Sequence, residues 1–161
     1  MSVILGPGPE VPPLAIWTKE SVSALYTATS SANFNDAFNA FLADDAVFTV
    51  NGKHLTRAQY KDLLQGEKFL EGSAQVSFSD SVEVPKNENE PAEAGSVGLF
   101  FKVTVAERDL VFGAPVTRTV TSSLNVTIVE DGSALNRRVS TLSQVVLTET
   151  SPIRPPTATV A

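Results

Sequence analysis

The hydrophobic pattern of this chain changes its period once, and that change constrains the fold more than any other feature. Between residues 18 and 66 apolar side chains recur at helical spacing, as Val22, Leu25 and Tyr26 do. From residue 72 onward they alternate one by one with polar side chains, which is typical of strands with one buried face. Helices followed by successive strands predict an α+β domain whose helices cover one face of a sheet.

The helical part divides into three predicted helices. Asn33 is the expected N-cap of the second helix. Thr56 and Gln59 form a capping-box pattern at the start of the third, and Gly66 is its expected stop. Between these two helices, residues 46–50 followed by Asn51-Gly52 predict a short strand and a tight turn.

The second part contains four predicted strands, the last over about Arg138–Thr148. Their connections are rich in Pro, Gly, Asn and Asp, so we expect an antiparallel meander. The domain organisation follows: a Pro/Gly-rich arm over residues 1–14, a single domain over 15–149 and a Pro-rich tail over 150–161.

Composition removes several classes of chemistry. The chain has 161 residues, no cysteine, a single histidine and a formal net charge of −6. Thiol nucleophiles, disulfides and multi-histidine metal sites are therefore excluded, and we expect no metal and no cofactor. The acidic balance argues against nucleic acid and membranes as partners. An N-terminal apolar run of only three residues is too short for a signal peptide, so a cytoplasmic location is expected.

The stretch YTATSSANFNDAFNAFLADDAVFTVNG, residues 26–52, resembles the nuclear transport factor 2-like superfamily, which includes SnoaL-like and ketosteroid-isomerase-like proteins. The resemblance extends over about residues 15–148 in the order of elements. It implies three helices packed on a strongly curved antiparallel sheet, a cystatin-like cone. It also implies a small-molecule site inside the cone and association as a homodimer. The superfamily includes both enzymes and binding modules, so function transfers less readily than fold.

Within that superfamily, the comparison with ketosteroid isomerase assigns positions individually. Tyr26 falls where that enzyme has its oxyanion-stabilising tyrosine. The general base falls on Val50, which cannot accept a proton, and the second oxyanion donor falls on Leu124 or Asn125. One donor is kept and the base is lost, so steroid isomerisation itself is not expected.

Three polar residues lie in register with apolar strand faces. Asp80 interrupts the face of Phe78 and Val82, while Arg118 and Ser122 flank Val120. A functional interpretation makes Asp80 a proton acceptor and Arg118 a clamp for developing negative charge, with Tyr26 as hydrogen-bond donor. The structural alternative is an Asp80–Arg118 ion pair, or a β-bulge that returns either side chain to solvent.

Further residues are candidates for lining a ligand site. Four aromatic side chains are expected to wall it: Phe38, Phe48, Phe78 and Phe101. Ser122 and Tyr60 would supply hydroxyls, or Tyr60 would only pack in the core. Trp17 is expected as a staple or lid over the cone mouth. His54 could act as a base, or lie exposed in its turn.

Threonine and serine dominate one strand face, with Thr117, Thr119, Thr121 and Ser123 as examples. This Thr-rich face predicts either a plain solvated surface or sheet-to-sheet dimerisation. Two functional hypotheses remain open. The first is a cone that binds a small apolar, oxygenated molecule, with cofactor-independent lyase, isomerase or cyclase activity. The second is a non-catalytic binding or scaffolding domain that acts as a homodimer.

Overall fold

Three helices and six strands make up the described part of the computed structural model, which covers residues 11–67, 73–111, 114–132 and 136–150. In chain order they are α1 (Leu14–Thr27), α2 (Ser31–Phe41), β1 (Leu42–Val50), β2 (Lys53–Leu55), α3 (Arg57–Glu67), β3 (Ser73–Pro85), β4 (Gly95–Val111), β5 (Ala114–Glu130) and β6 (Arg137–Thr150). This order confirms the predicted α+β class. The predicted arm and tail lie almost wholly outside the described residues.

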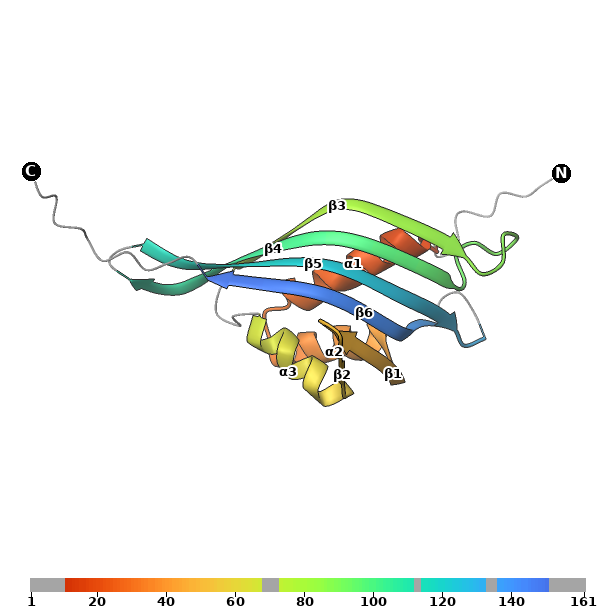
Figure 1. Cartoon of the computed structure of the whole chain (residues 1–161), viewed down its shortest axis with the longest axis horizontal. Coiled ribbons are helices and arrows are strands. Elements are labelled where there is room, and N and C mark those ends of the chain that lie inside the picture. The colour runs from red at the N-terminus through yellow and green to blue at the C-terminus, as the bar shows by residue number, and fades with distance from the viewer. Residues whose placement is uncertain (1–10, 68–72, 112–113, 133–135, 151–161) are drawn as a thin grey trace, which may run out of the picture.

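The strands form one sheet in the order β2-β1-β6-β5-β4-β3. Strands β3 to β6 are sequential antiparallel neighbours, as the meander prediction requires, and they bend together in Figure 1. The prediction of a wholly antiparallel sheet is wrong at β1, which pairs in parallel with β6, Phe48 lying opposite Leu142. A parallel pair needs a long connection, and the chain between these strands supplies it.

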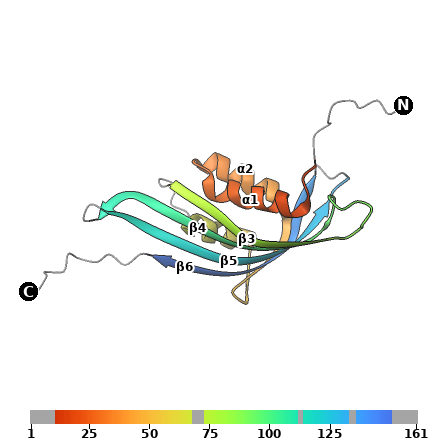
Figure 2. The ribbon, with the colours of Figure 1, turned by 90° about the horizontal axis from the view of Figure 1, so that it is seen from above.

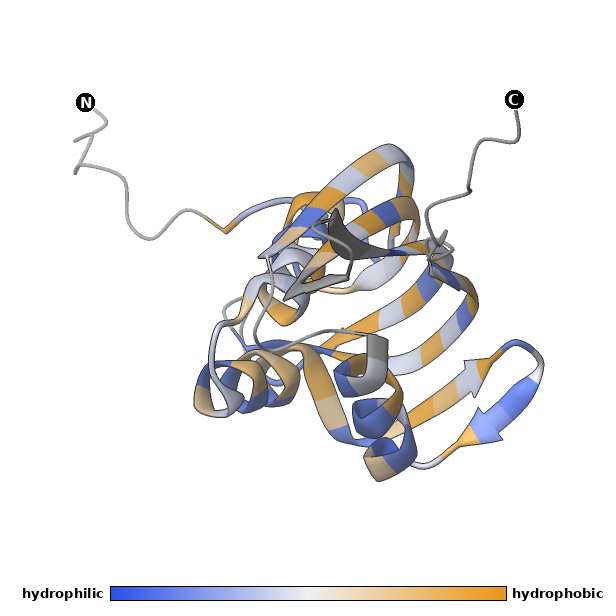
Figure 3. Ribbon diagram, turned by 90° about the vertical axis from the view of Figure 1, so that its left-hand side faces the viewer, coloured by the Kyte–Doolittle hydropathy of each residue, from blue (hydrophilic) through white to orange (hydrophobic). Residues whose placement is uncertain are grey.

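Helices α1 and α2 cover one face of the curved sheet, and Figure 2 shows no helix on the opposite face of β3–β6. We call the covered face inner and the bare face outer. Figure 3 shows the period-two alternation along the strands that separates the two faces. The core lies between the inner face and the helices. Its largest fully buried side chains include Leu14, Phe34, Phe38, Phe41, Phe48, Phe101, Ile128 and Leu142.

Helix ends follow the predicted chemistry with one change. The capping box of α3 is confirmed, because the backbone N–H of Thr56 donates to Gln59 Oε1 at 2.9 Å and the N–H of Gln59 donates to Thr56 Oγ1 at 3.1 Å. The N-cap of α2 is Ser30 rather than Asn33. Its Oγ accepts from the N–H of Asn33 at 3.1 Å, so the helix begins one turn before the predicted cap.

The turn between β1 and β2 is the predicted Asn51-Gly52 pair, with φ values of 51° and 80°. Positive φ at both positions is the geometry of a type I′ hairpin. The Asn51 side chain also pairs with the backbone of β6. Its Nδ2 donates to the carbonyl of Val146 at 3.1 Å, and its Oδ1 accepts from the N–H of Val146 at 2.9 Å. This contact fixes the hairpin against the middle of β6.

Candidate functional site

A chain of three buried polar side chains crosses the interior of the domain. The hydroxyl of Tyr60 donates to Oε1 of Gln144 at 2.8 Å, and Nε2 of Gln144 donates to Oγ of Ser122 at 2.7 Å. Tyr60, Gln144 and Ser122 are 3%, 2% and 1% exposed. Burying polar atoms is costly unless they are hydrogen-bonded to one another, and this chain meets that condition.

Three elements position this chain. Tyr60 projects from the first turn of α3, which the capping box fixes. Gln144 lies opposite Leu124 in the β5–β6 ladder, and Ser122 lies two residues along the same inner face. The backbone carbonyl of Gln144 accepts from the N–H of Asn51 at 2.9 Å. The β1–β2 turn therefore holds β6 at the residue that carries the amide.

Two groups of aromatic rings lie at the ends of the polar chain. The first aromatic cluster comprises Tyr26, Phe78 and Phe101, with ring centroids 6.0 Å apart for Tyr26–Phe101 and 5.9 Å for Phe78–Phe101. Ser122 is paired with Phe101 across β4 and β5, so the polar chain ends beside this cluster.

The second aromatic cluster surrounds the other end of the chain. It comprises Phe34, Phe38, Phe48 and Tyr60, and the closest pair, Phe48 and Tyr60, is stacked with centroids 4.8 Å apart. The four predicted wall residues are thus divided between the clusters. Phe38, Phe48 and Phe101 are fully buried and Phe78 is half-buried, with the Lys19 ammonium 5.9 Å from its ring.

Sequence reasoning found two members of the polar chain and missed the third. Ser122 and Tyr60 were expected to line the site, but Gln144 was not considered. The signal was present, because Leu142 and Gln144 alternate toward the buried face of the last strand. A polar amide on an otherwise apolar strand face is the same pattern that identified Ser122.

Tyr26 is buried on the core side of α1, as predicted, and its ring packs on Phe101. The structure also shows which of the other positions from the ketosteroid-isomerase comparison face the interior. Val50 and Leu124 are buried, whereas Asn125 lies exposed on the outer face. The uncertainty between Leu124 and Asn125 is therefore resolved: the inward residue is apolar and supplies no donor.

Asp80 does not point into the cone, so the orientation predicted from strict alternation is wrong. Phe78 pairs with Phe101 and Asp80 pairs with the adjacent Phe100, so one extra residue, Ser79, forms a β-bulge. Beyond the bulge the two faces of β3 exchange, and Asp80 is exposed on the outer face. The alternative of a bulge that returns this carboxylate to solvent describes the structure.

Arg118 is half-buried on the inner face and pairs with Val105 across β4 and β5. Its Nη1 donates to the backbone carbonyl of Gly66 in the last turn of α3. Asp80 and Arg118 therefore lie on opposite faces of the sheet, and the structure does not bring them together. Arg118 connects the sheet to the end of α3.

Trp17 lies in α1, and its half-buried ring packs against other side chains. The centroid of the Phe41 ring is 5.5 Å away, and the guanidinium of Arg137 lies 5.1 Å from the Trp17 centroid. Arg137 is buried and its Nη1 donates to the carbonyls of Pro12 and Ala92, both at 2.8 Å. Burial lowers the pKa of Arg137. These contacts place Trp17 in the packing of α1, nine residues or about 13 Å along the helix from Tyr26.

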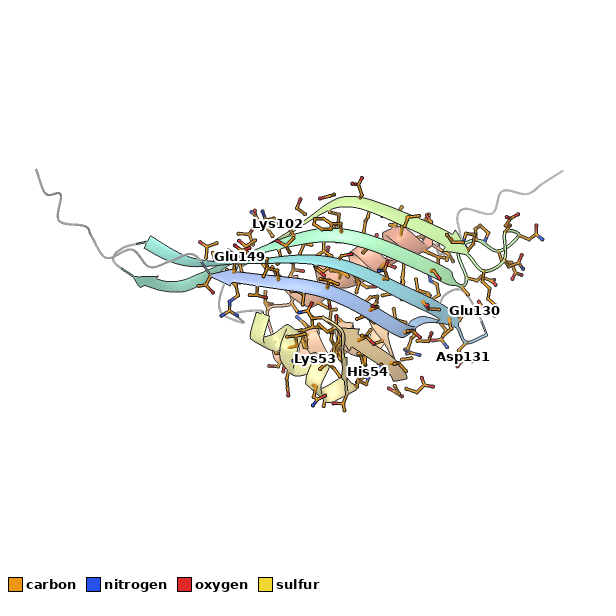
Figure 4. The ribbon with its side chains drawn as sticks, viewed as in Figure 1. Lys53, His54, Lys102, Glu130, Asp131 and Glu149 are labelled. Carbon is orange, nitrogen blue, oxygen red and sulfur yellow. The ribbon has the colours of Figure 1, made fainter. Side chains whose placement is uncertain are left out.

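His54 is exposed in the β1–β2 hairpin, which Figure 4 shows at the lower edge of the molecule. Its Nδ1 lies 3.3 Å from the Thr49 hydroxyl. Thr49 pairs with His54 across the hairpin and with Ser143 of β6, which is exposed on the outer face. His54 is thus outside the interior that holds the polar chain.

The buried polar and charged side chains among the described residues, apart from tyrosines, are Thr18, Ser122, Arg137 and Gln144. This set contains no carboxylate and no imidazole. In the same part of the chain, no group of three His, Cys, Asp or Glu side chains is arranged to hold a metal ion. The described helices include none that is long and apolar enough to cross a membrane.

A separate group of carboxylates lies at the β3–β4 connection. A hydrogen bond with the Glu90 side chain, burial and the charge of Glu130 raise the pKa of Glu93 to about 7. These residues line a surface hollow of about 690 Å³ between the connection and the end of β5. Figure 4 shows Glu130 at that end of the sheet.

Comparison with known proteins identifies the fold. No protein-family model matches the sequence, and no curated protein matches it significantly. Solved structures do match. A putative scytalone dehydratase from Novosphingobium aromaticivorans has a TM-score of 0.58 at 12% identity, covering 87% of each chain. A hexachlorocyclohexane dehydrochlorinase, LinA type 2, has a TM-score of 0.55 at 12% identity, covering 89% of this chain and 93% of that one.

An NTF-2-like protein of unknown function from Pseudomonas aeruginosa has a TM-score of 0.53 at 9% identity, covering 82% of this chain and 96% of that one. The chain therefore has the nuclear transport factor 2-like fold that residues 26–52 suggested. At these identities the similarity establishes the fold and not the activity.

Proposed function

We propose that this protein binds a small, largely apolar organic molecule inside the cone, between the two aromatic clusters. The observation that carries the proposal is the buried Tyr60–Gln144–Ser122 chain. A hydrogen bond contributes only about 1 kcal/mol net, and apolar side chains of similar shape would stabilise a core at least as well. A few convergent polar groups in an aromatic interior are instead the usual composition of a ligand site.

Binding without catalysis is the function that the described interior supports best. Acid–base catalysis needs a titratable group within hydrogen-bond reach of the reacting atoms. Asp80 and His54 lie outside the interior, and the buried polar set holds no carboxylate. Apart from arginine, the titratable groups of the described interior are the phenols of Tyr26 and Tyr60, whose rings pack on Phe101 and Phe48. The names of the dehydratase and the dehydrochlorinase describe those proteins, and their fold is compatible with either function.

The test compares two neighbouring serines that lie on opposite faces of β5. Ser122→Leu adds a bulky apolar side chain beside Phe101 on the inner face, whereas Ser123→Leu adds the same side chain on the outer face. Uncharged two-ring aromatic compounds should raise the unfolding temperature of the wild type and of Ser123→Leu, because a ligand that binds only the folded state stabilises it. Ser122→Leu should abolish the shift while circular dichroism shows an intact fold. The absence of any shift in the wild type would refute the proposal.

We further propose that two copies of the chain associate through the outer face. The large exposed apolar side chains gather there: Val47, Val82, Val84, Phe100, Val129, Val145 and Leu147. A hollow of about 270 Å³ on this face includes Val82, Val84 and Gly98. Exposed apolar groups of this kind mark interaction surfaces, and a self-complementary face produces a two-fold dimer.

Light scattering after gel filtration tests the dimer. The wild type should have twice the chain mass, and Leu147→Lys should give a monomer because it buries a charge in the contact. Ile16→Lys is the matched control, since Ile16 is also exposed but lies on α1. A monomeric wild type at micromolar concentration would contradict this assembly.

A further inference from the structure

The side chain of Asn51 continues the pairing of β1 with β6 beyond the end of β1. The register of the two strands ends where Val50 lies opposite Gln144, and the N–H of Asn51 donates to the Gln144 carbonyl at 2.9 Å. At Val146 the Asn51 carboxamide takes the place of a backbone peptide: its Nδ2 donates to the Val146 carbonyl and its Oδ1 accepts from the Val146 N–H. A carboxamide can do this because it carries a donor and an acceptor side by side, as a peptide group does. We call these two hydrogen bonds the Asn51–Val146 pair.

The sequence makes the same asparagine the one most prone to lose its amide. Asn51 precedes Gly52, and no other asparagine of the chain is followed by glycine. A glycine nitrogen can attack the Cγ of the preceding asparagine with little hindrance, because glycine has no side chain. A C–N bond then forms, and the carboxamide nitrogen leaves as ammonia. Water opens the resulting succinimide ring at either carbonyl and gives aspartate or isoaspartate.

Water has access to this turn, yet the folded structure opposes the reaction. Asn51, Gly52 and Lys53 are exposed, and Figure 4 shows Lys53 and His54 at the lower edge of the molecule. The Cγ of Asn51 must leave Val146 before the Gly52 nitrogen can reach it. Because both hydrogen bonds of the Asn51–Val146 pair must break first, the reactive arrangement should be at least about tenfold less populated than in the unfolded chain.

Either product of the reaction weakens the attachment of the hairpin to β6. Aspartate has no side-chain donor, so its carboxylate would face the carbonyl oxygen of Val146 with like partial charges. Isoaspartate adds a carbon atom to the backbone inside the turn. The φ values of 51° and 80° at Asn51 and Gly52 belong to a type I′ turn of ordinary backbone, which this addition disrupts.

We propose that Asn51 is a deamidation site: pairing with Val146 delays the loss of its amide in the folded chain, and conversion to aspartate or isoaspartate releases the β1–β2 hairpin from β6. Water is the only co-reactant, and the proposal does not depend on the proposed ligand or dimer. The effect reaches the interior, because the N–H of Asn51 binds the carbonyl of Gln144, whose side chain is the centre of the buried polar chain. Deamidation thus limits how long a folded copy keeps its full stability.

The rate of deamidation tests the protection. The full chain is incubated in mildly alkaline buffer with and without denaturing urea, and the tryptic peptide of residues 20–53 is followed by mass spectrometry. This peptide also contains Asn33, Asn35 and Asn39, which serve as internal references. In urea Asn51 should react faster than these three, and in the folded chain it should react at least about tenfold more slowly than in urea. Equal rates in the folded and unfolded chains would overturn the protective role of the fold.

Two substitutions of Val146 separate the Asn51–Val146 pair from the rest of the fold. Val146→Pro removes the N–H from which Asn51 Oδ1 accepts, whereas Val146→Ala keeps that N–H and also removes the valine side chain. Proline suits a strand position whose N–H does not pair with another strand. With the fold verified by circular dichroism, Asn51 should react several-fold faster in Val146→Pro than in Val146→Ala, and Asn33 should be unaffected. Equal rates in the two variants would show that Val146 is not the protecting partner.

A mimic of the product tests the release of the hairpin and stays decisive if Val146→Pro does not fold. In Asn51→Asp the backbone N–H groups at positions 51 and 146 should exchange with deuterium about tenfold faster, the equivalent of one hydrogen bond, while those in the middle of β4 and β5 keep their rates. Asn33→Asp makes the same change of charge in the first turn of α2 and should leave all these rates unchanged. Unchanged exchange at both hairpin positions in Asn51→Asp would overturn the proposed release.

Discussion

Replacing Gln144 by methionine should destabilise the protein by about 2 kcal/mol. The substitution keeps the length of the side chain but removes both hydrogen bonds of the buried chain, those with Tyr60 and Ser122. Each buried polar group deprived of its partner costs about 1–3 kcal/mol, and the apolar character of methionine offsets part of that loss. With a urea m-value of about 2 kcal/mol per molar, the unfolding midpoint should fall by about 1 M.

The assay uses the single tryptophan of the chain. Trp17 packs against Phe41 where α1 meets α2, so its fluorescence should change on global unfolding. Three variants complete the experiment: Tyr60→Phe, Ser122→Ala and the triple variant with Gln144→Met. The triple variant should be within about 1 kcal/mol of the wild type or more stable, because no buried polar atom of the chain is left unpaired.

Non-additivity is therefore the decisive result. If the three single effects sum to the effect of the triple variant, the side chains do not form one network in solution and the reasoning fails. If the triple variant is stable and two-ring aromatic compounds no longer raise its unfolding temperature, the chain is retained for ligand binding at some expense of stability.

Three other predictions concern the rest of the molecule. Gly95→Ala should lower the unfolding midpoint strongly in the same assay, because the added Cβ would lie 2.8 Å from Leu14 Cδ1. Gly66→Ala is the control and should be neutral or stabilising, because its added Cβ would have no atom within 4 Å. Equal midpoints for the two variants would contradict the close approach at Gly95. Because a carboxyl hydrogen bond raises the folded-state pKa of Glu93 to about 7, above its usual value of 4.5, the folded protein holds that proton over this interval. Thermal stability should thus fall as pH rises from about 4.5 to 7, and Glu93→Gln should reduce this dependence of stability on pH. Asp80→Asn should leave stability within about 0.5 kcal/mol of the wild type and should not change the unfolding-temperature shift caused by two-ring aromatic compounds. A marked loss of either would refute the surface position of Asp80.

The fold was predictable from local patterns, because period and turn chemistry are set within a few residues. The capping box at Thr56 and the Asn51-Gly52 turn are examples, and the structure confirms both. Partners distant in sequence were not predictable in the same way. The parallel contact of Phe48 with Leu142 depends on how the whole sheet curves, and no residue near β1 encodes it.

The candidate site was predicted in part for the same reason. Alternation placed Ser122 correctly because β5 pairs without a shift around that residue. It failed for Asp80 because a single extra residue in β3 exchanges the two faces, and the serine-rich sequence around Ser79 carries no mark of a bulge. Gln144 alternates with Leu142 toward the buried face of β6, so the same alternation indicates its position.

The parallel pairing of β1 with β6 also has a consequence for how the chain acquires its structure. Val50 of β1 lies opposite Gln144, so the contact must wait until nearly the whole domain has been synthesised. Contacts between such distant residues slow folding, because a long loop must close before any stabilisation is gained. During synthesis the α1–β2 segment therefore emerges without its main sheet neighbour, and its buried aromatic side chains are exposed at that stage. We expect ribosome-bound chains that end before β6 to depend on chaperones, and the completed chain to fold in a single late step.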